Sequence, residues 1–250
     1  MMLAIVWLVS GVALGQSDRQ SVEIQATSIT LPEPILASQV GDVRATIESV
    51  LGGLSYRQFA RDSVVAPVRI KLQYIRNEQG VRVGHLVHLA MIAHVDIAKL
   101  KSDSAMTELF GNGDEDAKLS QGELEERGVD GSDDAVRFRR LQFELLERIE
   151  LECVLRIASD ASPGRQRLDL QLDDRFDNRW KGEDAEGSYE GFAGWLHAAR
   201  VEDGAVFIEA RFAFTEPEVW FRGSNFLRSK LPLALQETAR EFRRRLKKSG

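Results

Sequence analysis

Oxygen-bearing side chains recur at regular intervals in one acidic stretch of the chain, residues 112–123. They occupy the first, third, fifth, ninth and twelfth places of that stretch, as Asn112, Asp114, Asp116, Ser120 and Glu123. Carboxylate, amide and carbonyl oxygens are the ligands that a hard cation such as Ca²⁺ prefers. The spacing therefore predicts a calcium site, and the chemistry of the stretch is cation binding rather than catalysis.

This stretch resembles the calcium-binding loop of the EF-hand family, over about 20 residues. The resemblance implies side-chain ligands from Asn112, Asp114, Asp116 and Glu123, a carbonyl ligand from Lys118, and a direct or water-mediated contact from Ser120. Leu119 and Leu124 match the apolar residues at the eighth place and after the last ligand. Two residues depart from the family pattern, because Ala117 replaces a glycine and Asn112 replaces the usual aspartate.

The same residues also fit a turn that needs no metal. Ser120 and Glu123 have the spacing of a capping box, in which each side chain accepts a hydrogen bond from the other residue's backbone at a helix start. Asn112 and Gly113 are a common turn pair. The sequence alone therefore leaves open whether residues 112–123 hold calcium or form a capped turn.

Hydrophobic periodicity predicts the elements around this stretch. Helical spacing predicts an amphipathic helix over residues 40–54, and a second helix follows Pro232 with an apolar face of Leu235, Ala239, Phe242 and Leu246. Alternation predicts a hairpin from segments 68–74 and 81–97. It also predicts a meander of four strands, over 149–157, 168–172, 189–201 and 206–214. Residues 135–148 fit either a helix or an early start of the next strand.

These elements come in blocks rather than in strict alternation, which favours an α+β fold. We expect a mostly antiparallel sheet (the hairpin plus the four-stranded meander), an amphipathic N-terminal helix, an EF-hand-like insert over 104–128 and a long C-terminal helix. All of these belong to a single domain over residues 16–250.

The N-terminal segment predicts export. Residues 1–15 carry no charge and are largely apolar, with small residues before polar Gln16. This pattern is typical of a cleaved signal peptide, although it lacks the usual basic start, and a retained anchor is the alternative. We expect a secreted or periplasmic protein without a stable membrane span after cleavage. The net charge of −6 argues against a nucleic-acid partner.

No catalytic constellation stands out, so the chain is predicted not to be an enzyme. His85, His88 and His94 share one strand-like segment, but His85 faces away from the other two, which are too far apart for one metal. Cys153 is the only cysteine, and its position in an alternating strand indicates a buried side chain. The acidic residues of the segment 173–186 fit a solvated loop, with a hydrolase site as the weakest alternative.

Two functions follow from these features. The first is an exported calcium-binding protein, with the loop serving stability or the docking of an unknown protein partner. The alternative is a carrier of a hydrophobic small molecule or lipid, because a curved antiparallel sheet with a long C-terminal helix resembles helix-grip, START-like folds in architecture.

Overall fold

The computed structural model describes residues 20–25, 27–38, 42–63, 65–101, 119–129, 136–146, 148–201, 204–221 and 225–248 of the 250-residue chain. The predicted signal peptide and most of the predicted calcium loop lie outside these residues. No helix within them is long and apolar enough to span a membrane.

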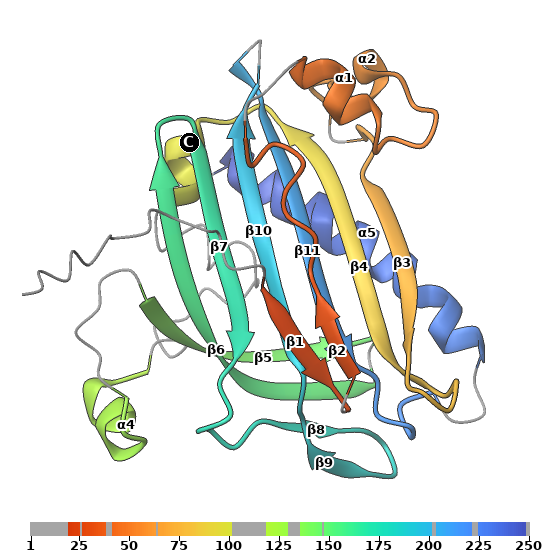
Figure 1. Cartoon of the computed structure of the whole chain (residues 1–250), viewed down its shortest axis with the longest axis vertical. Helices are drawn as coiled ribbons and strands as arrows, with labels where there is room; N and C mark the ends of the chain where they lie inside the picture. The colour runs from red at the N-terminus through yellow and green to blue at the C-terminus, as the bar shows by residue number, and fades with distance from the viewer. Residues whose placement is uncertain are drawn as a thin grey trace, which may run out of the picture.

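One large antiparallel sheet dominates the described part of the chain (Figure 1). Its main path runs β3 (Arg69–Arg76), β4 (Arg82–Ala93), β11 (Val206–Thr215), β10 (Phe192–Arg200), β7 (Arg165–Leu172), β6 (Ile149–Ser162), β8 (Arg179–Lys181) and β9 (Glu186–Ser188). A ninth strand, β5 (Val136–Leu145), pairs with β6 off this path. The strands at the centre of the sheet are long and rich in apolar and aromatic residues, which suits a sheet covered on both faces.

The sheet is strongly curved, and two glycines lie where its backbones come closest. A Cβ atom on Gly194 of β10 would stand 2.5 Å from Cβ of Phe212 on β11. A Cβ atom on Gly84 of β4 would stand 2.4 Å from the carbonyl oxygen of Phe214. Glycine in a strand interior commonly marks such a bend or close approach. Figure 1 also shows β6 bending, so that its first half and β5 cross one end of the sheet.

The inner face of the sheet, defined as the face toward the C-terminal helix, is apolar. Helix α5 (Asn225–Lys248) crosses this face (Figure 1). Ala239, Phe242 and Leu246 of α5 pack in one cluster with Met91, Leu196 and other strand residues. These apolar residues of α5 hold the helix on the sheet, because an amphipathic helix gains most of its stability from packing its apolar side.

The outer face is covered by the N-terminal part of the chain. The strands β1 (Ser21–Ile24) and β2 (Thr27–Thr30) form a separate hairpin that lies over it. Residues 31–38, which we call the strap, continue from this hairpin across the sheet. They are followed by the short helices α1 (Val43–Glu48) and α2 (Tyr56–Phe59). Leu31 packs in one cluster with Trp195, and Leu36 packs in another with Phe207 and Ile92.

The predicted fold class is wrong, because the described chain is predominantly β rather than α+β with an N-terminal helical layer. The helix expected over 40–54 is limited to six residues, Val43–Glu48. Asp42 fixes its start by accepting hydrogen bonds from the backbone N–H groups of Arg44 and Ala45, and Gly52 and Gly53 follow with positive φ values. The segment that fitted either a helix or a strand is β5, and it extends the sheet beyond the predicted meander.

The flanks of the predicted EF-hand insert also differ from expectation. Before it lies the 3-10 helix η1 (Ile97–Lys101), and near its C-terminal end the described helix α4 (Gln121–Glu126) has only six residues. The described residues therefore do not support a helix–loop–helix insert as part of the fold. At the C-terminus, α5 begins at Asn225, so Pro232 lies inside the helix and not in its first turn.

Candidate functional site

The residues predicted to bind calcium are only partly described. Asn112, Asp114, Asp116 and Lys118 lie outside the described residues, whereas Ser120 and Glu123 lie at the start of α4. Among the residues that the structure describes, no three His, Cys, Asp or Glu side chains gather as a metal-binding group. Calcium binding at residues 112–123 therefore stays a prediction from the sequence.

Ser120 and Glu123 form the capping box that the sequence offered as the alternative. Oε2 of Glu123 accepts hydrogen bonds of 2.8 Å from both the backbone N–H and the hydroxyl of Ser120. Its other oxygen, Oε1, lies 2.8 Å from Nη2 of Arg140 on β5. The Ser120 backbone, the Ser120 hydroxyl and Arg140 together lower the pKa of Glu123 to about 2. A cation that used Glu123 would have to replace these partners.

The inner face of the sheet contains apolar side chains that remain partly exposed although they lie on its central strands. Ala210 and Phe212 on β11, Phe192 on β10 and Leu89 on β4 all face α5 in this way. Their register partners and α5 neighbours are apolar as well, among them Leu196, paired with Ala210, and Val87, paired with Phe212. Leu235, at the middle of α5, is also only partly buried. These residues form apolar surface on the inner face that α5 leaves partly exposed.

A buried charged group stands at one end of this inner face. His85 of β4 is fully buried, and its Nε2 bonds to Oε2 of Glu216, just after β11. The other carboxylate oxygen of Glu216 lies 2.7 Å from Nη2 of Arg228 on α5. Burial opposes ionisation of Glu216, but the hydrogen bonds from His85 and Arg228 outweigh it and lower the pKa of this carboxyl. The group links two strand ends to the first turns of α5.

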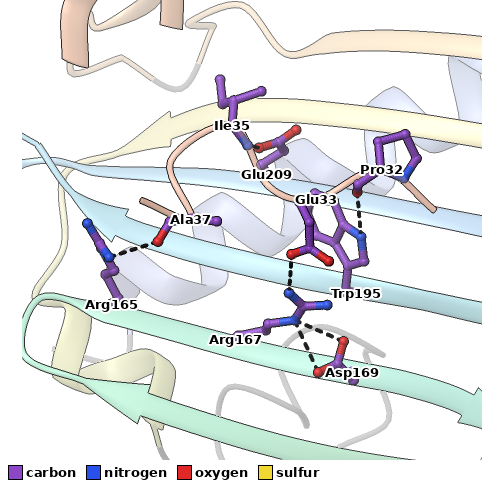
Figure 2. Close-up of polar contacts among 9 residues, drawn as sticks. All are labelled: Pro32, Glu33, Ile35, Ala37, Arg165, Arg167, Asp169, Trp195 and Glu209. Carbon is purple, nitrogen blue, oxygen red and sulfur yellow. Dashed lines mark hydrogen bonds and ion pairs between the residues drawn. The ribbon is translucent and has the colours of Figure 1, made fainter. Parts of the chain in front are cut away.

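The outer face carries a second polar network, which fixes the strap (Figure 2). Glu209 of β11 is fully buried, and its carboxylate accepts hydrogen bonds from the backbone N–H of Ile35 at 2.9 Å and from Nε2 of His88 at 2.8 Å. Arg167 of β7 bridges Glu33 at 2.7 Å and Asp169 at 3.0 Å. All of these groups face strap residues or each other, so the network serves to hold the strap on the sheet.

Two further contacts complete the attachment of the strap. Nε1 of Trp195 donates a hydrogen bond of 3.1 Å to the carbonyl of Pro32, and Nη1 of Arg165 donates one of 2.8 Å to the carbonyl of Ala37 (Figure 2). Burial lowers the pKa of the neighbouring His197 to about 4. The His197 ring is therefore neutral at pH 7.

A cavity of about 180 Å³ lies beside α4, but its charges are already balanced. Three arginines line it, and each is paired with a carboxylate: Arg127 with Asp177, Arg140 with Glu123, and Arg179 with Glu152. Cys153 also lines the cavity, and burial, followed by the nearby Glu152, raises the pKa of its thiol to about 12. The burial of Cys153 agrees with the prediction from its alternating strand.

Sequence reasoning did not identify the buried charged group on the inner face. His85 was expected to be an ordinary strand histidine, and nothing in the sequence connects it with Glu216 or Arg228, which lie more than a hundred residues away. The alternation of β4 does correctly separate His85 from His88, because the two rings lie on opposite faces and bond to different carboxylates. The carboxylate partners follow only from the pairing of β4 with β11.

Comparison with known proteins gives distant structural similarities only. No protein-family model and no curated protein matches the sequence. Among solved structures, human StAR-related lipid transfer protein 5 aligns with 82% of this chain and 97% of its own, at 10% identity and a TM-score of 0.42. Human STARD10 aligns with 86% of this chain and 84% of its own, at 11% identity and a TM-score of 0.31.

A conserved protein from Geobacillus kaustophilus aligns with 66% of this chain and 96% of its own, at 10% identity and a TM-score of 0.35. Similarities at these levels are too distant to assign a family or a function to this chain.

Proposed function

We propose that this protein binds a small, mostly apolar molecule between the inner face of its sheet and α5. The observation that carries the proposal is the partial exposure of Phe192, Ala210 and Phe212 on the central strands. Where a helix packs closely on a sheet, side chains at the middle of the contact are normally fully buried, at the density of an organic crystal. Exposed apolar surface at that position indicates room for a ligand.

The chemistry of the lining suits an apolar ligand. Partly exposed side chains from four strands and α5 contribute only hydrocarbon and aromatic surface, as Ile70, Leu72, Leu89, Ala210, Phe212, Phe192 and Leu235. The charged group of His85, Glu216 and Arg228 is confined to one end. Small-molecule sites typically combine a mostly apolar wall with a few polar groups that orient the ligand.

The test is a binding titration with an apolar fluorescent probe, 11-(dansylamino)undecanoic acid, on the folded protein and on Ala210→Phe. Ala210 lies on the inner face and retains exposure, so the added ring projects into the proposed space and not into packed core. We expect saturable binding to the native chain and a loss of at least about tenfold in affinity in Ala210→Phe, since several apolar contacts are blocked.

The matched control is Lys71→Phe, which adds a ring of the same size to an exposed position on the outer face of β3. This variant should bind the probe as the native protein does. Absence of saturable binding by the native protein, or equal affinity in both variants, would show that the inner face does not bind apolar ligands.

A further inference from the structure

His197 of β10 lies between the two side chains that anchor the middle of the strap. In the sheet register its neighbours on the outer face are Arg167 of β7 and Glu209 of β11. Arg167 bonds to the carboxylate of Glu33, and Glu209 accepts a hydrogen bond from the backbone N–H of Ile35 (Figure 2). The strap therefore passes over His197 between these two anchors, and His197 is only 4% exposed.

The surroundings of the buried ring disfavour a positive charge on it. Burial is the largest obstacle, because a charged imidazole under the strap would lose its hydration. The carboxylates of Glu209 and Glu33 favour the charge, whereas the guanidinium groups of Arg165 and Arg167 oppose it. The net effect lowers the pKa of His197 to about 4, so the ring is neutral while the strap covers it.

The other charged groups beside His197 already pair with one another. His88 of β4 lies 2.8 Å from Glu209, and Arg211 of β11 lies 3.5 Å from the same carboxylate. On β7, Asp169 lies 3.0 Å from Arg167. A proton added to the His197 ring would therefore leave this cluster with an excess of positive charge.

Lifting the strap removes the main obstacle to protonation. Water then reaches the His197 ring, which returns to the ordinary pKa of a solvated histidine, about 6.5. Between this value and the lowered value of the closed form, only the open form binds the proton. Acid favours whichever form binds more protons, so the closed form is most stable above pH 6.5 and loses stability as the pH falls toward 4.

We propose that His197 makes the strap an acid-sensitive switch, closed on the outer face at neutral pH and released in mildly acidic solution. Release uncovers an apolar part of the sheet, because Leu31 of the strap packs in one cluster with Trp195, and Leu36 packs in another with Phe207. This inference does not depend on the proposed function, since the strap covers the outer face and the ligand would bind on the inner face.

Hydrogen exchange of the full folded chain, followed by mass spectrometry at pH 7, 6 and 5, measures the opening of the strap. The protection of residues 31–37 is compared after correction for the intrinsic pH dependence of exchange. Uptake of one proton by the open form predicts about a twentyfold loss of protection between pH 7 and pH 5. The protection of α5, on the opposite face, should stay constant. Ordinary carboxyl groups take up protons mainly below this range, so the loss reports on a histidine.

Two matched substitutions identify which histidine is responsible. His197→Gln keeps a polar side chain of similar size but removes the group that titrates, so its strap should lose less than about threefold of its protection between pH 7 and pH 5. The control His88→Gln makes the same change on the same face, at a histidine that bonds to Glu209. The twentyfold loss should persist in this control.

The proposal is overturned if the protection of the strap in the native protein does not change between pH 7 and pH 5. An equal loss in the native protein and in His197→Gln would overturn it too, as would an equal loss in the strap and in α5, because the whole molecule would then be unfolding. If His197→Gln does not fold, NMR of the histidine rings in the native protein decides. A His197 ring that is neutral at pH 6 supports the switch, and one that is already protonated contradicts it.

Discussion

Two buried glutamates, one on β11 and one just after it, form hydrogen bonds on opposite faces of the sheet. Glu209 faces outward and bonds to the strap and His88, whereas Glu216 faces inward and bonds to His85 and to Arg228 of α5. A buried carboxylate is tolerated only when it is paired and hydrogen-bonded, and both of these are. The positions of these carboxylates therefore depend on the layers that cover them.

The Glu216 carboxylate should make the stability of the protein fall at acidic pH. Because the folded-state pKa of Glu216 lies below its ordinary value, its contribution is complete above the ordinary carboxyl pKa and is lost as the pH falls through the lowered folded value. Glu216→Gln should reduce the free energy of unfolding by about 2 kcal/mol at pH 7, through the loss of charged hydrogen bonds.

Urea unfolding at pH 7 and at pH 3 measures this effect. The difference between native protein and Glu216→Gln should shrink at pH 3, because below its ordinary pKa this carboxyl is protonated in the unfolded native chain, which offsets the stability that the ionised carboxylate gives the folded state. A difference that is the same at both pH values would mean that ionised Glu216 adds no stability.

At the scale of elements, the two covers of the sheet are attached by different forces. Helix α5 packs mainly through apolar side chains such as Phe242 and Leu246. The strap contributes two buried leucines, but its backbone is held by hydrogen bonds to side chains of three different strands. Within the strap the backbone N–H of Ala37 bonds to the carbonyl of Pro34, and the side chains of the sheet supply partners for other backbone groups of this irregular segment.

The contact between Trp195 and the strap provides a test of this attachment. Trp195→Phe keeps an aromatic ring in the core but leaves the carbonyl of Pro32 without its donor. We expect a loss of about 1–2 kcal/mol in the free energy of unfolding. Hydrogen exchange should accelerate at residues 31–37, and exchange in α5, on the opposite face, should not change. Unaltered exchange in the strap would show that the remaining contacts are sufficient to hold it.

At the scale of the whole molecule, local patterns predicted most strand positions, and long-range pairing decided the rest. Alternation located the strands that became β3, β4, β6, β7, β10 and β11, because each has one apolar face. It did not reveal that residues 136–145 continue the sheet, since Phe138 and Leu141 among several arginines fit a helix equally well. Helical spacing overestimated the length of the helix predicted over 40–54. Its later apolar residues are buried in a turn, and glycines end that turn.

The candidate site was less predictable than the sheet for a similar reason. The capping box of Ser120 and Glu123 is a local pattern, and the sequence predicted it correctly as one of two alternatives. The contacts of His85, Glu216 and Arg228 depend on strand register and on the docking of α5, which no local pattern encodes. Composition also did not predict that apolar residues of the central strands remain partly exposed.

Calcium binding remains testable through the stability of the whole chain. A single extracellular site of the predicted kind has a Kd of roughly 10⁻⁴ to 10⁻³ M, so 10 mM calcium should stabilise the folded protein by about 1.4–2.7 kcal/mol. The melting temperature should rise with calcium in the native protein and stay constant in Asp114→Ala. Glu125→Gln, an exposed change nearby in α4, is the control and should respond as the native protein does.

A melting temperature that does not move with calcium in the native protein would mean that residues 112–123 bind no calcium. The capping box would then be the complete explanation of Ser120 and Glu123.

The edge of the sheet at β3 has a consequence for how copies of this protein behave together. An edge strand offers backbone groups that can pair with another chain, which is a route to fibres and precipitates. Along β3, Lys71 and Arg76 are exposed, and Arg69 is half-buried. Two such edges brought together antiparallel would set positive charges against each other. The basic side chains of β3 therefore favour a dispersed protein over sheets that grow from molecule to molecule.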